Sequence, residues 1–300
     1  MVFDSNFLKN YFLPEKVRTD SCTLSINGKK KEISILRLDL IHPIRGGNKG
    51  FKLYRNVIEF YEGKYKGMIS AGGTFSNHIA ALAEVGMDLK IPVAAFIRGE
   101  ASPNPSPTIK KAMEAGMEMI YLSREEYRIL RNDGANAFIN DKFKEYYFIP
   151  EGGSNKAGLE GCAYISRYIP AHFSHILLAV GTGTTLAGIA SQLDKEQELI
   201  GVKVVEAKQE KFVSKALSQT NTSAAQLKFC DEFTFGGYAK KSLEMEQFVE
   251  NWNEKQQVLI EPIYTGRLFY GLTQMLQQNY FPENANILLI HSGGRQYLDH

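Results

Sequence analysis

Short apolar runs alternate with amphipathic segments through most of this 300-residue chain. The runs are rich in Val, Ile and Leu and rarely place a polar residue at every second position. That pattern is typical of strands buried on both faces of a parallel sheet. We predict strands over residues 67–70, 93–97, 118–122, 146–149, 175–180, 200–205 and 287–291.

Between these runs, apolar residues recur three and four positions apart, which is the spacing of a helix that buries one side. We predict helices over residues 53–61, 77–85, 108–115, 158–168 and 185–193. The alternation of strands and helices indicates an α/β fold, with parallel sheets and helices on both faces.

Charge and cysteine content narrow the class of protein. Lys and Arg number 35 against 33 Asp and Glu, and no basic stripe is interleaved with aromatic residues, so we expect no nucleic-acid partner. Cys22, Cys162 and Cys230 are odd in number and far apart, which fits neither a disulfide framework nor a zinc site. We therefore expect no metal and a reducing compartment.

The ends and the hydropathy of the chain predict where it acts. The first residues lack a basic flank followed by an apolar core, so no secretory signal is expected. No apolar stretch approaches the length that spans a bilayer. We expect a cytoplasmic protein with no membrane partner, long enough to form a core without disulfide or metal staples.

Lys49 lies in a turn, Gly46-Gly47-Asn48-Lys49, that leads directly into a predicted helix. Glycine permits backbone conformations that a side chain penalises, and it lets a ligand approach closely. A lysine in such a cleft loses its proton readily and forms Schiff bases. On the motif alone, a solvated loop lysine is the favoured interpretation. Lys52 shares the same helix face, and we expect it to be solvated.

Four further segments combine small residues and hydroxyls at the boundary of a predicted strand or helix. They are residues 70–78 (SAGGTFSNH), 180–185 (VGTGTT), 261–267 (EPIYTGR) and 290–294 (IHSGG). In the second segment, amides, hydroxyls and a helix start converge, which predicts a phosphate cup. A dinucleotide-binding loop would need a small residue at Leu186. A helix cap with small residues for close packing is the alternative.

Taken in order with the Lys49 turn, these segments resemble the pyridoxal-phosphate enzymes of the tryptophan-synthase-β-like fold, fold type II. Within that group they are similar to the 1-aminocyclopropane-1-carboxylate (ACC) deaminase and D-cysteine desulfhydrase family, from about Leu36 to Gly294. The resemblance implies pyridoxal 5'-phosphate as cofactor and a homodimer. It also implies a small α/β domain of residues 51–154, inserted into a large cofactor-binding domain of residues 1–50 and 155–300, with the cofactor in the cleft between them.

The resemblance further implies roles for individual residues. Lys49 would carry the cofactor as a Schiff base, and Asn77 would bond its phenolic oxygen. Ser76 would lie beside the substrate carboxylate or the reacting carbon. Both Ser76 and Asn77 also suit a helix N-cap. The phosphate would bind to Gly181, Thr182, Gly183, Thr184 and Thr185.

Two tyrosines and a serine complete the implied site. Tyr238 and Tyr264 match active-site tyrosines of the family, and Tyr264 would transfer a proton or orient the substrate. A core tyrosine with a satisfied hydroxyl is the alternative for each of them. Ser292 matches the position whose side chain reaches the pyridine nitrogen of the cofactor.

The implied activity is that of a lyase or deaminase acting on a small amino acid. Thr265 stands where ACC deaminases carry glutamate, and a hydroxyl at Ser292 does not hold the pyridine nitrogen protonated. Both features favour α,β-elimination, so D-cysteine desulfhydration to pyruvate, ammonia and sulfide is the first prediction. ACC deamination is the alternative. A nicotinamide-binding oxidoreductase and a non-catalytic carrier of the cofactor are more remote.

Overall fold

The structure is a computed structural model that describes residues 4–205, 209–218, 226–235 and 242–293. The chain forms two compact units. The first contains Met1–Leu13 and Ile44–Gly161, and the second contains Pro14–Pro43 and Cys162–His300. The sequence-based domain assignment, with boundaries after residues 50 and 154, stays a prediction. In the structure, α2 (Asn48–Glu62) continues without a break through residues 50 and 51.

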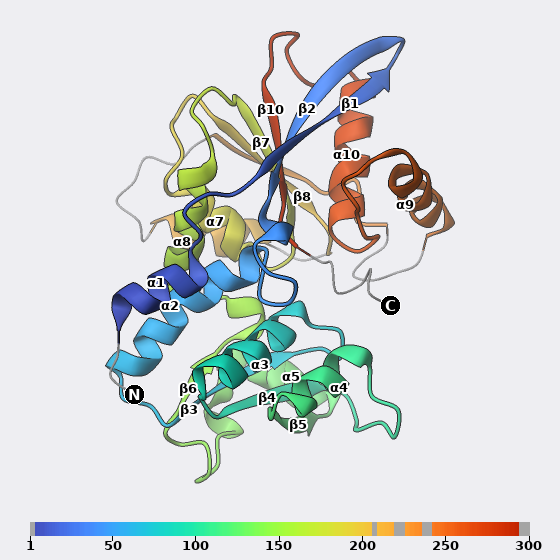
Figure 1. The fold of residues 1–300 in the computed structure, drawn as a ribbon. Helices are drawn as coiled ribbons and strands as arrows, with labels where there is room; N and C mark the ends of the chain where they lie inside the picture. Colours follow the sequence, from blue (N-terminus) through green and yellow to red (C-terminus); the bar gives the residue numbers. More distant parts are fainter. Residues whose placement is uncertain (1–3, 206–208, 219–225, 236–241, 294–300) are drawn as a thin grey trace. The chain divides into compact units, whose positions relative to one another are not determined.

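The first unit is built on a four-stranded parallel sheet (Figure 1). Its strands, in spatial order, are β5 (Glu118–Leu122), β4 (Val93–Arg98), β3 (Gly67–Gly72) and β6 (Tyr146–Ile149). Its helices, besides α2, are α1 (Ser5–Phe12), α3 (Asn77–Leu89), α4 (Pro107–Glu114) and α5 (Arg124–Asp133), with short 3-10 turns at Ala135–Ala137 and Glu151–Gly153.

Helices cover both faces of this sheet. On one face Ile69 and Phe96 pack with Tyr127 and Leu130 of α5 in a buried cluster. Neighbouring strand residues point to the opposite face. There Ser70 contacts the first turn of α3 through a hydrogen bond. The arrangement explains why these strands read as nearly continuous apolar runs.

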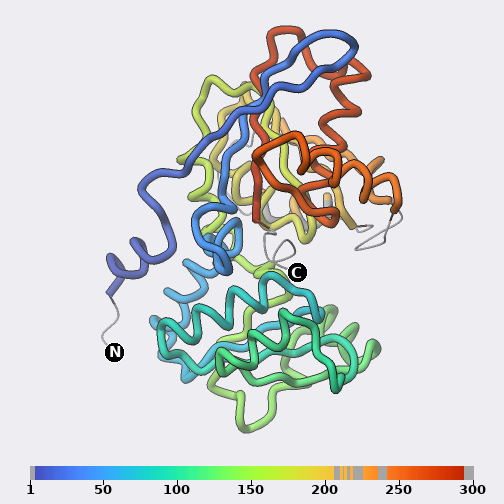
Figure 2. The backbone as a smooth tube through the Cα atoms, turned by 45° about the vertical axis from the view of Figure 1, so that its right-hand side comes forward, coloured from blue at the N-terminus to red at the C-terminus, as the bar shows by residue number. Residues whose placement is uncertain are grey.

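The second unit contains a six-stranded sheet. Its strands, in spatial order, are β1 (Thr19–Ile26), β2 (Lys29–Arg37), β10 (Ile287–His291), β7 (His175–Val180), β8 (Glu198–Lys203) and β9 (Gln226–Cys230). Only the β1–β2 pair is antiparallel among the described strands. Asn27 and Gly28 join these two strands with positive φ angles of 51° and 76°, as a tight hairpin turn requires. The backbone of the hairpin is drawn in blue in Figure 2.

The helices of the second unit also lie on both faces of their sheet. They are α7 (Thr184–Ala190), α8 (Gln209–Ser218), α9 (Leu243–Lys255) and α10 (Thr265–Gln277). Helix α6 (Lys156–Ala163) begins in the first unit and ends in the second, and the 3-10 turn Tyr164–Tyr168 follows it. Trp252 and Phe269, from α9 and α10, pack on the face that carries Ile200 and Val202. Gly201 faces the other way, where Leu186 of α7 fills the space beside it.

The predicted class of fold is confirmed, and each predicted strand is found within a few residues of its expected place. The hairpin β1–β2 and the edge strand β9 are additions that the apolar runs did not predict. Among the described residues, no helix is both long and apolar enough to cross a membrane.

Candidate functional site

Lys49 is the second residue of α2, and glycines on both sides shape its backbone. Gly47 has φ +64° and ψ −152°, a conformation that side chains disfavour. A Cβ at Gly50 would stand 2.8 Å from the carbonyl oxygen of Arg45, so the turn can close only over glycine. Lys49 is half-buried, and its Nζ donates a hydrogen bond of 2.5 Å to Asn48 Oδ1.

Lys52 is buried, which corrects the expectation of a solvated lysine. Its Nζ donates to the carbonyl oxygen of Gly152 at 2.7 Å. A Cβ on Gly153 would lie 3.3 Å from the Lys52 side chain and 3.4 Å from Cε1 of His78. The glycine pair after β6 therefore lets the chain pass close to these two side chains.

Ser76 is the N-cap of α3, and its Oγ accepts a hydrogen bond from the backbone N–H of Ile79 at 3.3 Å. The capping alternative is therefore real, although it does not exclude a further role. Ser76 and Asn77 are both half-buried. A Cβ on Gly72 would approach Ser76 Oγ to 2.8 Å, so this glycine at the end of β3 makes room for the cap.

His78 anchors the start of α3 to the sheet. Ser70 Oγ donates to the carbonyl oxygen of Ile149 at 2.8 Å and lies 3.1 Å from His78 Nε2. Because the hydroxyl proton is used there, Nε2 carries the proton that joins His78 to Ser70. Burial, then the charge of Lys52, then that of Lys49 lower the pKa of His78 to about 3. The ring is therefore neutral. Because the charges of Lys49 and Lys52 act on His78, the starts of α2 and α3 lie near each other.

Gly181 to Thr185 form the turn between β7 and α7. Gly183 precedes the helix with φ +90°, in the left-handed region that favours glycine. Thr182 Oγ1 and Thr184 Oγ1 are 3.0 Å apart, and Thr184 and Thr185 are buried. Cys162 Sγ lies 3.7 Å from Thr185 Oγ1, so the thiol packs beneath this turn.

Tyr264 lies beside that turn. A Cβ added to Gly181 would stand 3.6 Å from Tyr264 Cε1, so the backbone of the turn and the aromatic ring are in close reach. Tyr264 is half-buried and immediately precedes α10. The structure therefore brings Tyr264 together with the predicted phosphate cup, which the distance along the chain could not show.

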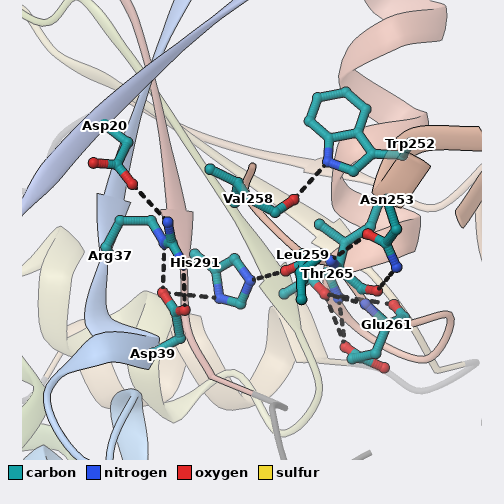
Figure 3. Close-up of polar contacts among 11 residues, drawn as sticks. Asp20, Arg37, Asp39, Trp252, Asn253, Val258, Leu259, Glu261, Thr265 and His291 are labelled. Carbon is teal, nitrogen blue, oxygen red and sulfur yellow. Dashed lines mark hydrogen bonds and ion pairs between the residues drawn. The ribbon is translucent and has the colours of Figure 1, made fainter. Parts of the chain in front are cut away.

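Glu261 holds the start of α10 (Figure 3). Its buried carboxylate accepts from the backbone N–H groups of Ile263, Tyr264 and Thr265 at 2.7, 2.9 and 2.8 Å. Burial raises the pKa of Glu261, and these hydrogen bonds oppose the shift. A carboxylate here also suits the positive end of the helix dipole.

Thr265, the position at which the resemblance leads us to expect a glutamate in ACC deaminases, is fully buried. Its Oγ1 accepts from the backbone N–H of Glu261 at 2.9 Å and donates to Glu261 Oε1 at 3.1 Å. The hydroxyl therefore serves the turn that leads into α10. Glu261 has no role in the sequence-based prediction, although an acidic residue shortly before a helix start is a signal that could have found it.

Ser292 directly follows β10 and is half-buried. Ile290 of β10 pairs with Leu178 of β7, so Ser292 and Gly181 both lie just past the carboxyl ends of adjacent parallel strands. Ligands of parallel sheets bind at this edge. Tyr238 falls outside the described residues, so the second candidate tyrosine has no described position.

The candidate residues thus form two groups. Lys49, Ser76 and Asn77 belong to the first unit, and the Gly181–Thr185 turn, Tyr264 and Ser292 belong to the second. Within the described ranges, no group of three or more His, Cys, Asp and Glu side chains is placed to hold a metal ion.

These residues fit pyridoxal phosphate. Lys49 supplies an amine held at the end of a glycine turn. The Gly181–Thr185 turn supplies hydroxyl groups and lies close to the ring of Tyr264. A Cβ added at Gly181 would stand 3.6 Å from Cε1 of that ring. Ser292 supplies a hydroxyl at the neighbouring strand end. An α/β fold that carries residues of these types is typical of an enzyme of the pyridoxal-phosphate class.

Comparison with known proteins supports the same class of enzyme. Residues 25–293 match the family described as "Pyridoxal-phosphate dependent enzyme", and the chain belongs to this family, whose cofactor is pyridoxal 5'-phosphate. The fold is therefore the tryptophan-synthase-β-like fold type II that the motifs predicted.

Among its relatives is a Thermotoga maritima protein named "Putative 1-aminocyclopropane-1-carboxylate deaminase", 28% identical over 283 residues, 87% of this chain and 88% of that protein. A Pyrococcus furiosus protein of the same name is 27% identical over 282 residues, 88% of this chain and 84% of its own length. A crystal structure described as an "ACC deaminase homologue" has a TM-score of 0.78 at 23% identity, covering 100% of this chain and 98% of that one. These two relatives are thus named as putative ACC deaminases, while the family match establishes the pyridoxal-phosphate-dependent class.

Proposed function

We propose that this protein releases ammonia from a small amino acid and that ACC is the first substrate to test. The names of the relatives support ACC over D-cysteine as the substrate. They therefore favour ACC deamination, the alternative predicted from the sequence, over D-cysteine desulfhydration, the first prediction. The observation that carries the proposal is Lys49 at the start of α2, held by glycines in a chain that matches the family over residues 25–293.

Lys49 is the proposed attachment point and proton carrier. Its amine, next to Asn48 Oδ1, would hold the cofactor covalently and, once released, would hold or move a proton at the substrate carbon. The chemistry that pyridoxal phosphate supplies when bound is an electron sink for the carbon that bears the amino group. Half-burial limits the access of water to this amine.

Ser76 and Asn77 would orient the substrate and the cofactor ring. Both lie at the amino terminus of α3, where backbone N–H groups and the helix dipole favour a carboxylate. The neutral His78 fixes this helix start on Ser70 without adding a positive charge beside Lys49. These residues therefore need to be rigid rather than reactive.

Thr182, Thr184 and Thr185 would bind the phosphate, with hydrogen bonds to charged oxygens that contribute about 1.5–3 kcal/mol each. Tyr264 would move a proton with its hydroxyl, and Ser292 would bond the ring nitrogen. Glu261 fixes the backbone of Tyr264, so that the ring approaches the Gly181 turn in one orientation.

D-cysteine desulfhydration is kept as a second candidate, because Thr265 stands in place of a glutamate. In the structure this threonine bonds Glu261. A glutamate there would press a second carboxylate against a buried one, so the chain lacks that acid for a structural reason as well. The difference still favours elimination chemistry, in which a thiol leaves the β-carbon.

The test is a substrate panel on the purified enzyme loaded with pyridoxal phosphate. ACC, D-cysteine, L-cysteine, D-serine and L-serine are compared by the rate of oxoacid release. The proposal predicts 2-oxobutanoate from ACC faster than pyruvate from any other member. Pyruvate from D-cysteine with ACC inert would instead establish the second candidate, and release of no oxoacid from any of them would reject both.

A further inference from the structure

His291 is a buried side chain to which the proposed chemistry gives no role. It is the last residue of β10 and directly precedes Ser292. Figure 3 shows its ring between two groups: Nε2 lies 2.9 Å from the carbonyl oxygen of Leu259, and Nδ1 lies 3.4 Å from Asp39 Oδ1. A leucine would fill similar space, so the polarity of this ring needs an explanation.

The hydrogen bond to Leu259 fixes the state of the ring. A carbonyl oxygen can only accept, so Nε2 carries the proton. Burial lowers the pKa of His291, while the neighbouring Asp39 opposes that shift. The ring is therefore neutral, with an unprotonated Nδ1 toward Asp39. That carboxylate is already matched by Arg37, whose Nε and Nη2 donate to it at 2.8 and 2.7 Å.

Arg37 and Asp39 form a rigid wall beside the ring. Arg37 also donates to Asp20 of β1 at 2.6 Å, and it pairs in register with His291 across the β2–β10 ladder. Both Arg37 and Asp39 are buried. Three charge-assisted hydrogen bonds, two to Asp39 and one to Asp20, hold the Arg37 guanidinium in one geometry. The ring of His291 is thereby confined on the Asp39 side.

On its other side, the ring holds the segment that carries Tyr264. Leu259 is followed by Ile260, whose N–H and C=O are bonded to the side chain of Asn253 at 2.9 and 3.0 Å. The carboxylate of Glu261 comes next and fixes the N–H of Tyr264. The hydrogen bond from His291 thus connects the strand end that precedes Ser292 to the segment that ends at Tyr264.

We propose that His291 is a positioning residue, which sets Tyr264 relative to Ser292 through its hydrogen bond to Leu259. The proposal rests on the roles given above to these two residues. Sub-ångström placement matters at such a site, because a displacement of about 1 Å can cost on the order of a hundredfold in rate. His291 itself contacts neither substrate nor cofactor in this role.

The test compares His291→Gln with His291→Asn in the loaded enzyme. A glutamine amide can donate from the place of Nε2, whereas an asparagine amide is too short to reach Leu259. We expect the Asn variant to lose about ten- to a hundredfold in kcat and to bind pyridoxal phosphate more weakly, with KM for the best substrate changing less. The Gln variant is expected to stay within about threefold of wild type in all three quantities.

Gln197→Asn is the matched control. Gln197 is buried, and its Nε2 donates to the carbonyl oxygen of Phe173 at 2.9 Å. Gln197 directly precedes β8 and so lies at the amino ends of the parallel strands, whereas Ser292 follows the carboxyl end of β10. This variant also shortens a buried side chain that bonds a backbone carbonyl. It should lower the melting temperature of the cofactor-free protein, as we also expect of His291→Asn, but leave kcat and the cofactor dissociation constant unchanged.

Two results would overturn the positioning role: wild-type kcat and cofactor affinity in His291→Asn, or an equal loss of both in Gln197→Asn. Failure of the proposed function is seen separately, because it requires that the wild-type protein itself binds no pyridoxal phosphate or releases no oxoacid from the substrate panel.

Discussion

Burial keeps two histidine side chains of this protein neutral. His78 and His291 are both almost fully buried, and burial lowers the pKa of each ring. Both use Nε2 to anchor a segment that bears candidate site residues, namely α3 and the approach to α10. Neutral rings hold these segments without adding charge next to Lys49 or Arg37.

The neutral state of His78 predicts a pH dependence of stability. The pKa is about 3 in the folded protein against 6.5 as the ordinary value. Between these values the unfolded chain binds a proton that the folded chain does not, so the free energy of unfolding falls as the pH drops below 6.5. The slope from this group is at most about 1.4 kcal/mol per pH unit.

This dependence is measured by urea unfolding of the cofactor-free protein at pH 7 and pH 5. Wild type should lose about 1–2 kcal/mol more than His78→Gln over that interval, because glutamine can still donate to Ser70 but does not titrate. Identical losses in the two proteins would show that His78 is charged in the fold or already exposed.

Some residue-scale features could be predicted from the sequence, and others depend on contacts between distant segments. The glycine turn before Lys49 and the small residues at 181–185 were visible as motifs. The burial of Lys52 was not, because it depends on Gly152, one hundred positions away. The contacts among Arg37, Asp39 and His291 could not be predicted for the same reason, since these residues come together only through the pairing of β2 with β10.

At the scale of elements, periodicity predicted the parallel strands well, because strands buried on both faces read as apolar runs. The β1–β2 hairpin was missed, since β2 begins with three lysines and β1 alternates exposed and buried residues. The dipeptide Asn27-Gly28 was its signal, because it is favoured in two-residue hairpin turns. Helix α10 was likewise visible only through the motif that precedes it.

The start of α2 gives a prediction at this scale. Gly50→Ala places a methyl group 2.8 Å from the Arg45 carbonyl oxygen, a backbone atom that cannot move without the turn before Lys49. The variant should lower the free energy of unfolding by about 1–3 kcal/mol, although alanine has the better helix propensity by about 1 kcal/mol. Urea unfolding of the cofactor-free protein measures the change.

Gly73→Ala is the control for that substitution, since a methyl group there finds its nearest atom, Nη2 of Arg98, at 3.8 Å. Its free energy of unfolding should stay within about 1 kcal/mol of wild type. Equal stability of the Gly50→Ala protein and wild type would mean that the turn before Lys49 is less tightly constrained than the structure indicates.

At the scale of the whole molecule, the family match covers candidate residues from both units. The proposed attachment lysine is in the first unit, while the proposed phosphate cup, Tyr264 and Ser292 are in the second. The family match covers residues 25–293 and so includes all of them. The homodimer, the cytoplasmic location and the domain boundaries implied by the resemblance remain predictions.

The central claim is that Lys49 holds the cofactor, and borohydride reduction of the loaded protein followed by peptide mass spectrometry tests it most directly. Reduction makes the lysine–cofactor bond permanent, so the label marks the attachment residue. The control is Lys52→Met, which removes the nearby buried lysine and should leave the label in place. We predict a single phosphopyridoxyl label on Lys49 in both proteins and none in Lys49→Ala. A label on Lys52 or on any other lysine, or an unlabelled wild-type protein, would contradict the account.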